Sequence, residues 1–381
     1  MSERLRVLLF GRYADADFGG IERHVRSLVD AMPDDVEFVN LVEGRGLPIA
    51  PGWRCPVEVS RALAVVASLP ICPGMPSKAR ALHATHRFHI AHLHLPDPMS
   101  HLAAALLPPE VRIVVTWHSD IVRQKSVYGL YRPALRRLMA RTGAVIAPTP
   151  AHFTSMPQLA ELAPKDKRVV VPFGFDLERF STPHPLAPEL RRRLGEGVVF
   201  ALGRHVYYKG FEYLIRAMAL APDARLVLGG SGPLTERFRA LATESGVADR
   251  VVFAGRIGED ELPAYYQACD VFCLPAVEPS EAFGIVQVEA MAAGKPVLCT
   301  QLDNGVNWVN PHERTGLAVP PRDERALSAA IIRLLGDAEL RKRLGDEAAR
   351  RAHASFSLTA LRSGTLAAYE RALGRGAQAR L

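Results

Sequence analysis

Cysteine and long apolar runs are both scarce in this chain. Its five cysteines form no pairing typical of a metal site, and three lie in apolar, strand-like runs, so we expect a reducing, cytoplasmic compartment. No apolar run reaches the roughly 20 residues that a membrane-spanning helix needs. The opening MSERLRVLLF suits a buried first strand better than a signal peptide. These absences argue against an integral membrane protein.

Two common nucleotide-binding patterns are also missing. The chain has neither the GxxxxGK[ST] pattern of P-loop enzymes nor the GxGxxG pattern of dinucleotide enzymes, which weakens the kinase and dehydrogenase interpretations. It does have glycines at the ends of strand-like runs, in ALGRH and VLGGSGP, where the backbone can approach a ligand closely. Gly203 and Gly230 are therefore candidate contacts to a bound cosubstrate.

Basic residues exceed acidic ones, 47 to 40, and many of them lie between residues 112 and 141. That segment has seven lysines and arginines and a single acid, Asp120. Such a run is typical of a solvated helix face; as a functional interpretation we favour attraction to the phosphates of an anionic membrane surface or acceptor. A nucleic-acid site is disfavoured because aromatic residues are few there and no nucleic-acid-binding motif accompanies the run.

Apolar strand-type runs alternate with helix-type segments along the whole chain, which predicts an α/β protein with two doubly wound parallel sheets. A proline-rich passage at residues 171–188 is the expected hinge. We expect Rossmann-like domains at residues 1–178 and 179–356, with a C-terminal helix at 357–381 that packs back on the first domain. A functional cleft between the domains is expected at the carboxyl ends of the strands.

Two cations stand at a strand-to-helix turn in the second half, in ALGRHVYYKGFEYLIRAM. Arg204 and Lys209 flank this turn, so both can reach one anion near the amino end of the following helix. A diphosphate fits such a site. The alternative is that both residues are ordinary surface cations beside a loop.

The stretch EPSEAFGIVQVEAMAAGKPV, residues 278–297, holds Glu281 and Glu289 with seven residues between them. Eight helical steps would separate the two carboxylates by about 12 Å along the axis. The acid pair of a glycoside hydrolase lies only about 5 to 9.5 Å apart, so this spacing suits the two ends of one elongated ligand better. Carboxylates bind vicinal hydroxyls well because both oxygens accept hydrogen bonds.

This stretch resembles the Glu-x7-Glu signature of retaining glycosyltransferases of the GT-B type, a large family that includes bacterial lipopolysaccharide mannosyltransferases. The resemblance covers nearly the whole chain, because seven segments occur in the family's order: FGGIERHV, TWHSD, GRHVYYKG, GGSGP, FAGRI, YYQACDVFCLP and AFGIVQVEAMAAGKPV. It implies the GT-B fold, in which two Rossmann-like domains face each other across a cleft.

The resemblance also implies roles for matching positions. Gly19 and Gly20 would form a glycine loop that approaches the sugar diphosphate. Arg204 and Lys209 would neutralise the departing diphosphate, and His118 of WHSD would face the donor sugar from the first domain. Fixed cations of this kind lower the barrier because they stabilise the charge that develops on the leaving group.

In the second domain, the resemblance assigns the donor sugar to Glu281 and the ribose hydroxyls to Glu289. It further implies contacts to the phosphates, the sugar and the nucleobase, partly through the main chain, from Phe283, Gly284, Ile285, Arg256 and Ile257. No bound metal and no cofactor are expected to be required, because the nucleotide-diphosphate sugar is a cosubstrate.

The implied function is retaining transfer of a hexose in lipopolysaccharide, O-antigen or other surface polysaccharide synthesis. WHSDIVRQK and NGVNWVNP resemble segments of O-antigen mannosyl- and rhamnosyltransferases, which favours GDP-mannose or GDP-rhamnose as the donor. NGVNWVNP lacks the Gly-Thr-Ser-rich form usual there. The expected acceptor is a lipid-linked saccharide, with the enzyme peripheral on the inner face of the cytoplasmic membrane. The alternatives are a UDP-sugar-dependent enzyme of this fold and a non-catalytic nucleotide-sugar-binding protein.

Two groups of side chains are of types that can bind a metal ion. In HIAHLHLPDP, His92 and His94 share one face of a strand and His89 points to the other, so a position near the acceptor is favoured over zinc. Asp15 and Asp17 are interpreted as solvated loop acids. We therefore assign no metal site.

The uncharged run ALAVVASLPICPGMP, residues 62–76, is too short to cross a bilayer. It is typical of a core helix followed by a proline turn. The rival interpretation is a surface element that contacts a membrane or a lipid-linked acceptor, assisted by the nearby Lys78 and Arg80.

Overall fold

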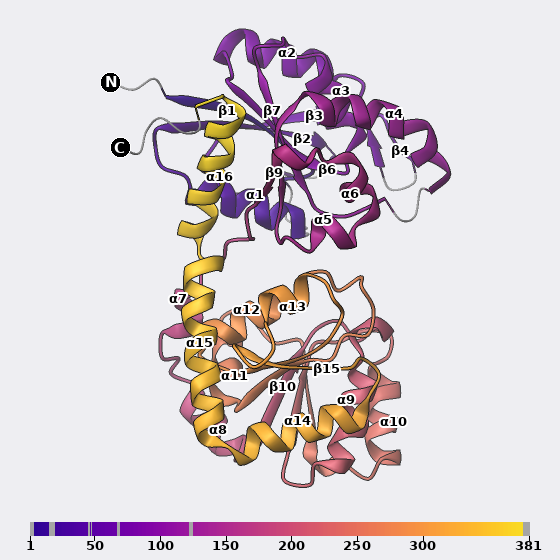
Figure 1. The fold of residues 1–381 in the computed structure, drawn as a ribbon, viewed down its shortest axis with the longest axis vertical. Helices are drawn as coiled ribbons and strands as arrows, with labels where there is room; N and C mark the ends of the chain where they lie inside the picture. Colours follow the sequence, from indigo (N-terminus) through magenta and orange to yellow (C-terminus); the bar gives the residue numbers. More distant parts are fainter. Residues whose placement is uncertain are drawn as a thin grey trace. The chain divides into compact units, whose positions relative to one another are not determined.

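The structure is a computed structural model that describes residues 4–14, 20–44, 46, 48–66, 69–121 and 125–375, excluding the side chains of 125–127. The chain forms two compact units (Figure 1). Unit 1 consists of Met1–Phe175 and Leu358–Leu381, and unit 2 consists of Asp176–Ser357. Unit 2 is thus inserted into the sequence of unit 1. The boundary expected from the sequence, between residues 178 and 179, lies three residues beyond this division.

Unit 1 is built on a seven-stranded parallel sheet of order β3-β2-β1-β6-β7-β8-β9. Because β1 pairs with both β2 and β6, the strand order reverses there, which makes the carboxyl ends of β1 and β6 the topological switch point. The strands are β1 Leu5–Gly11, β2 Val36–Gly44, β3 Val57–Arg61, β6 Ile90–Leu95, β7 Arg112–Trp117, β8 Thr142–Ala147 and β9 Arg168–Val170.

Helices cover both faces of this sheet, and alternate residues of β1 belong to different cores. Leu8 and Phe10 pack in the layer under α2 to α6, whereas Val7 and Leu9 pack under α1 and α16. The C-terminal α16 lies beside α1 (Figure 1). The helices are α1 Gly20–Ala31, α2 Met75–His86, α3 Pro98–Ala105, α4 Lys125–Arg141, α5 His152–Ser155, α6 Pro157–Leu162 and α16 Leu358–Ala372.

Unit 2 has a six-stranded parallel sheet of order β12-β11-β10-β13-β14-β15, and its switch point lies between β10 and β13. The strands are β10 Val198–Leu202, β11 Arg225–Gly229, β12 Val251–Gly255, β13 Val271–Leu274, β14 Val297–Thr300 and β15 Gly316–Val319. The helices are α7 Glu178–Ser181, α8 Ala187–Leu194, α9 Phe211–Leu220, α10 Thr235–Glu244, α11 Leu262–Ala268, α12 Ile285–Ala292, α13 Gly305–Val309, α14 Glu324–Gly336 and α15 Ala338–Phe356. Both sheets confirm the expectation of two doubly wound parallel sheets.

The core helix expected within residues 62–76 is wrong. β4 Ala64–Val66 and β5 Leu69–Ile71 form an antiparallel hairpin, and α2 begins only at Met75. The β-branched Val65 and Val66 favour an extended backbone, and Pro70 cannot continue a helix. The hairpin is exposed, because Val65 and Val66 retain 61% and 59% of their accessible surface.

Candidate active site

The switch point of unit 2 brings together one predicted cation and one predicted acid. Lys209 ends a short 3-10 turn after β10, Tyr207–Lys209, and Glu281 lies in the loop after β13. The Lys209 Nζ is 2.6 Å from a carboxylate oxygen of Glu281, and each side chain is only 12% exposed. Two opposite charges are therefore held largely out of solvent at the edge where ligands bind in sheets of this kind.

A glycine allows the turn that carries Lys209 to approach the β13 loop. Gly210 has a φ of 68°, and a Cβ atom there would lie 2.0 Å from the Pro275 carbonyl oxygen. The backbone N–H of Val277 donates to the Tyr208 carbonyl at 2.8 Å. These contacts fix the distance between the two loops, so the Lys209 and Glu281 side chains are positioned by their backbones as well as by their charges.

Asn304 holds the Glu281 loop from the other side. Its Nδ2 donates to the Glu281 carbonyl at 2.8 Å, while its Oδ1 accepts from Val306 N at 3.0 Å and caps α13. Gln287 Nε2 donates to the Phe283 carbonyl at 2.7 Å. Asn304, which stands where NGVNWVNP departs from the Gly-Thr-Ser-rich form, thus orients the acidic loop through its amide.

The expectation that Glu281 and Glu289 mark two ends of one helix is wrong. α12 begins at Ile285, and its N-cap Gly284 is in the left-handed region with a φ of 72°. Glu281 therefore precedes the helix by a full loop, and the axial separation of about 12 Å does not apply. Phe283 is buried and packs edge-on against Phe356, so its side chain faces the core of unit 2.

Glu289, on α12, accepts a hydrogen bond of 2.7 Å from the Tyr266 hydroxyl of α11. Tyr266 is fully buried, and this burial, together with the adjacent Glu289 carboxylate, raises its pKa well above the usual value. The hydroxyl therefore stays protonated and donates. The sequence segment YYQACD contains Tyr266, but spacing alone did not assign it to the acid.

The remaining predicted residues of unit 2 lie after neighbouring strands. A Cβ atom at Gly230, whose φ is 102°, would lie 2.0 Å from the Gly203 carbonyl oxygen, so the loops after β10 and β11 are in close contact. Arg204 and Arg256 are exposed. Ile257 follows β12 and lies against Gly229 at the end of β11. The carboxyl ends of β10 and β13 thus bring together Lys209, Glu281 and Gly203. The other predicted pair, Arg256 and Ile257, follows β12, which lies two strands away from β10.

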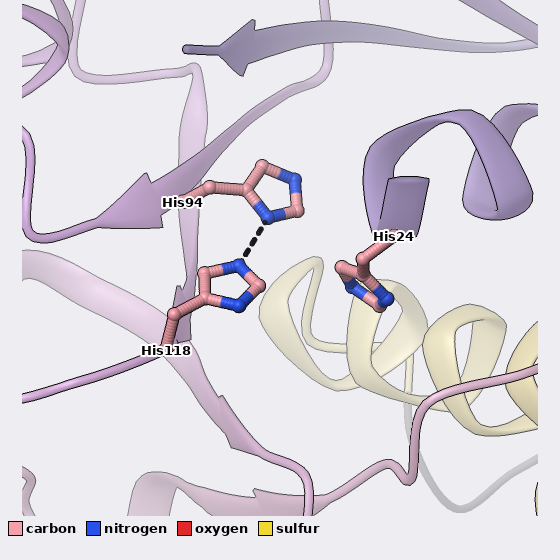
Figure 2. A group of neighbouring side chains, drawn as sticks. All are labelled: His24, His94 and His118. Carbon is pink, nitrogen blue, oxygen red and sulfur yellow. Dashed lines mark hydrogen bonds between the residues drawn. The ribbon is translucent and has the colours of Figure 1, made fainter. Parts of the chain in front are cut away.

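Three histidines of unit 1 converge at its own switch point (Figure 2). His24 projects from α1, His94 from the end of β6 and His118 from the segment after β7. His94 Nδ1 and His118 Nε2 are 2.9 Å apart, and the His24 ring centroid is 5.5 Å from that of His94 and 5.4 Å from that of His118. The sequence predicted His118 and placed His94 at a strand end. It did not assign His24, although FGGIERHV contains it.

Burial keeps these imidazoles neutral near pH 7. It lowers the pKa of His24 to about 4 and the pKa values of His94 and His118 well below the usual value, with the neighbouring imidazoles lowering the latter two further. Neutral imidazoles can accept hydrogen bonds from sugar hydroxyls or bind a metal ion.

The other histidines of this region have structural partners. His92 stacks on His94 with a centroid distance of 4.7 Å and bonds to the Tyr369 and Thr116 hydroxyls, both at 2.8 Å. His89, in contrast, accepts from the Arg6 backbone N–H at 3.1 Å. Gly20 opens α1; Gly19, Asp15 and Asp17 lie outside the described residues.

Comparison with known proteins identifies the family. Residues 18–179 match the model of Glycosyltransferase Family 4, and residues 186–351 match that of Glycosyl transferases group 1. The chain therefore belongs to this family of glycosyltransferases.

Three relatives show what this chain is similar to. O-antigen chain mannosyltransferase C of Escherichia coli is 32% identical over 71% of this chain and 72% of its own length. D-rhamnosyltransferase WbpZ of Pseudomonas aeruginosa is 29% identical over 86% of both chains. A GDP-mannose-dependent α-(1-6)-phosphatidylinositol monomannoside mannosyltransferase of Mycobacterium tuberculosis is 32% identical over 70% of this chain and 71% of its own.

The fold is shared with solved glycosyltransferase structures. Anabaena HepE, solved in complex with UDP, aligns with a TM-score of 0.77 at 20% identity and covers 95% of this chain and 98% of its own. Together with the two Rossmann-like sheets, this similarity defines the GT-B fold.

Proposed function

We propose that unit 2 binds a nucleotide-diphosphate sugar through the Lys209–Glu281 pair. The observation that carries this proposal is the 2.6 Å ion pair at the switch point, with both side chains largely buried. The Lys209 ammonium suits the diphosphate, and the Glu281 carboxylate suits the hydroxyls of the transferred sugar. Glu289, held by Tyr266 Oη at 2.7 Å, supplies a second fixed carboxylate for the ribose.

Transfer breaks the bond between the anomeric carbon and the phosphate oxygen and forms a bond from that carbon to the acceptor oxygen. The electron pair of the broken bond goes to the diphosphate, whose negative charge Lys209 and Arg204 stabilise. The acceptor proton passes to a phosphate oxygen of the leaving group. We infer retention of configuration, in which the oxygen that attacks would use the same face of the sugar as the oxygen that leaves.

GDP-mannose is the donor we favour. Two relatives at 32% identity carry mannosyltransferase in their names, and one of those names states GDP-mannose dependence. GDP-rhamnose is the second candidate because of the rhamnosyltransferase relative. A UDP sugar and a non-catalytic sugar-nucleotide binder are the alternatives that the experiment below distinguishes.

We propose a lipid-linked saccharide at an anionic membrane surface as the acceptor. No helix among the described residues is long and apolar enough to span a membrane. We propose that the contact is peripheral. The exposed hairpin offers Leu63, Val65 and Val66 at 75%, 61% and 59% exposure. Such side chains can enter the interface between head groups and acyl chains.

The basic run contributes less free charge to this surface than the sequence suggests. Arg132 and Arg136 both pair with Glu161, at 2.6 and 2.7 Å, and Arg141 donates to the Ala105 carbonyl. Arg137 is exposed on the same helix. We therefore assign most of the proposed membrane affinity to the apolar hairpin and a smaller part to charge.

The test has two arms. Thermal unfolding of the full chain is followed with GDP-mannose, GDP-rhamnose, UDP-glucose and ADP-glucose, and the GDP sugars should raise the melting temperature most. Product formation is then measured with the stabilising donor and a synthetic prenyl-diphosphate saccharide. Stabilisation by UDP-glucose alone would show that the donor is a UDP sugar and not a GDP sugar. Stabilisation without any transfer or donor hydrolysis would favour the non-catalytic binder.

A further inference from the structure

The ring nitrogens of three histidines of unit 1 lie close enough together to bind one ligand. One ring nitrogen of each of His24, His94 and His118 lies within 4.8 Å of the others (Figure 2). His24 Nδ1 and His94 Nε2 are buried and have no hydrogen-bond partner among the residues that the structure describes. A buried polar atom left without a partner destabilises the fold, so both nitrogens are candidates to bind a ligand.

We propose that His24, His94 and His118 form a site for a divalent transition-metal ion, with Zn²⁺ or Co²⁺ as the fitting class. Neutral imidazoles bind such ions well and bind Mg²⁺ or Ca²⁺ poorly, because those ions prefer oxygen ligands. Three histidines also leave a fourth tetrahedral position open to water or another ligand.

The geometry needs only a small adjustment. Nitrogens on one tetrahedral Zn²⁺ lie about 3.3 Å apart, given Zn–N bonds of about 2.0 to 2.1 Å. The three ring nitrogens lie within 4.8 Å of one another and have to move closer together. Rotation of His24 about its side-chain bonds supplies most of this change, since its Nδ1 is not held by a hydrogen bond within the described chain.

Two neighbouring side chains already restrain the three imidazoles. His92 stacks on His94 and is itself held between Tyr369 and Thr116. The Phe173 ring packs against His24 and His118, at centroid distances of 5.1 and 6.0 Å. Packed neighbours of this kind fix the orientation of ligating imidazoles.

Metal binding at this site should inhibit sugar transfer, an expectation that rests on the proposed function. An ion bound by His118 would take the imidazole expected to face the donor sugar, so Zn²⁺ should inhibit transfer in a saturable manner. The proposed role of the metal is therefore that of an inhibitory ligand of unit 1.

Binding is tested without reference to activity. The full chain is stripped with EDTA, dialysed and titrated with Co²⁺, and the visible d–d absorption and bound stoichiometry are recorded. We expect one equivalent of Co²⁺ with tetrahedral bands, displaced by Zn²⁺ and unaffected by excess Mg²⁺. His24→Gln and His94→Gln should each weaken binding at least about tenfold. His101→Gln is the matched control, because His101 is also buried in unit 1 but bonds to Tyr131.

Several outcomes overturn the proposal. Absence of bound Co²⁺ in the wild-type chain would refute the site. Equal binding by His24→Gln would assign the bound metal to other residues. If His94→Gln does not fold, as judged by circular dichroism, His24→Gln alone decides the matter. Metal binding without inhibition of transfer would refute the inhibitory role. Metal binding by a chain that transfers no sugar would count against the proposed function but would still support the metal site.

Discussion

Lys209 and Glu281 form a partly buried ion pair across the point where the strand order of unit 2 reverses. The Nζ to carboxylate distance is 2.6 Å, and the two residues come from the loops after β10 and β13, which are neighbours in the sheet but lie far apart in the sequence. Removal of either partner leaves a desolvated charge without its counterion. The pair therefore provides the sharpest test of the site.

Lys209→Ala and Glu281→Ala should each lower kcat for transfer by roughly a hundredfold to a thousandfold, the usual effect of removing a preorganised charge at the leaving group or sugar. The chain should still fold, because both residues lie in loops outside the sheet of unit 2, but each variant should unfold at a lower temperature because the remaining charge loses its counterion. The measurement is steady-state transfer together with circular dichroism. Lys342→Ala, which breaks an exposed pair with Asp346, is the control and should leave kcat unchanged. Near-normal turnover in both variants would remove these residues from the catalytic site.

Tyr266→Phe removes the hydroxyl that donates to Glu289 at 2.7 Å. A hydrogen bond to a charged group contributes about 1.5 to 3 kcal/mol, so KM for the donor should rise roughly tenfold or more while kcat changes little. Donor KM is measured with acceptor saturating. Tyr265→Phe, at the adjacent half-buried position on α11, should behave as wild type. An unchanged KM in Tyr266→Phe would show that Glu289 does not need this hydroxyl to bind its ligand.

Glu43 makes the stability of the chain depend on pH. Burial, the adjacent Asp97 carboxyl and a hydrogen bond to Asp97 raise the pKa of Glu43 to about 9, against a smaller opposing effect of Arg12. The folded state therefore holds a proton that the unfolded state releases near pH 4.5. The stabilisation is present below that pH and is lost as the pH rises toward 9.

Glu43→Gln should abolish this dependence, because the amide keeps the shape and a donor toward Asp97 without ionising. Between pH 5 and pH 9 the wild-type chain should lose stability relative to the variant by on the order of 2 to 4 kcal/mol. Calorimetric unfolding of both proteins at several pH values gives the difference. Parallel curves for the two proteins would mean that Glu43 is ionised in the folded state.

The exposed hairpin predicts membrane binding that depends on apolar contact. Val65→Ser with Val66→Ser should lower sedimentation with anionic lipid vesicles by about tenfold or more, since each buried valine is worth about 1.5 to 3 kcal/mol. High salt should weaken wild-type binding only in part. Ile332→Ser, at a position 51% exposed on α14 of unit 2, is the control. No sedimentation of the wild-type chain at low or high salt would end the membrane proposal.

The long buried strands could be predicted from the sequence because each is an uninterrupted apolar run covered on both faces. β1, β6 and β10 are of this kind. β3 and β15 were missed. β3 lies at the sheet edge with one of its five residues buried, and β15 is GLAV, in which glycine and alanine take two of four positions, so neither has a strong pattern. The hairpin was predicted as a helix because the spacing of apolar residues alone does not distinguish a short apolar strand from a helical segment.

The sequence predicts candidate site residues where a charged side chain directly follows a strand. It does not predict residues that reach the site by hydrogen bonds from another part of the chain. Lys209 and Glu281 stood out as a cation and an acid beside glycine turns. Tyr266 donates to Glu289 on another helix and Asn304 donates to the Glu281 loop, and no local spacing reveals either contact. His24 belongs to a quoted motif, but its approach to His94 depends on how α1 packs on the sheet.

The hydrogen bond between His92 and Tyr369 joins positions 277 residues apart. During synthesis the ribosome has to release the whole of unit 2 before α16 can cover the β1 face and complete that layer of unit 1. Unit 2 is therefore free to fold first, although its sequence begins second. A nascent chain arrested before Leu358 should therefore contain a folded unit 2 and an incompletely folded unit 1.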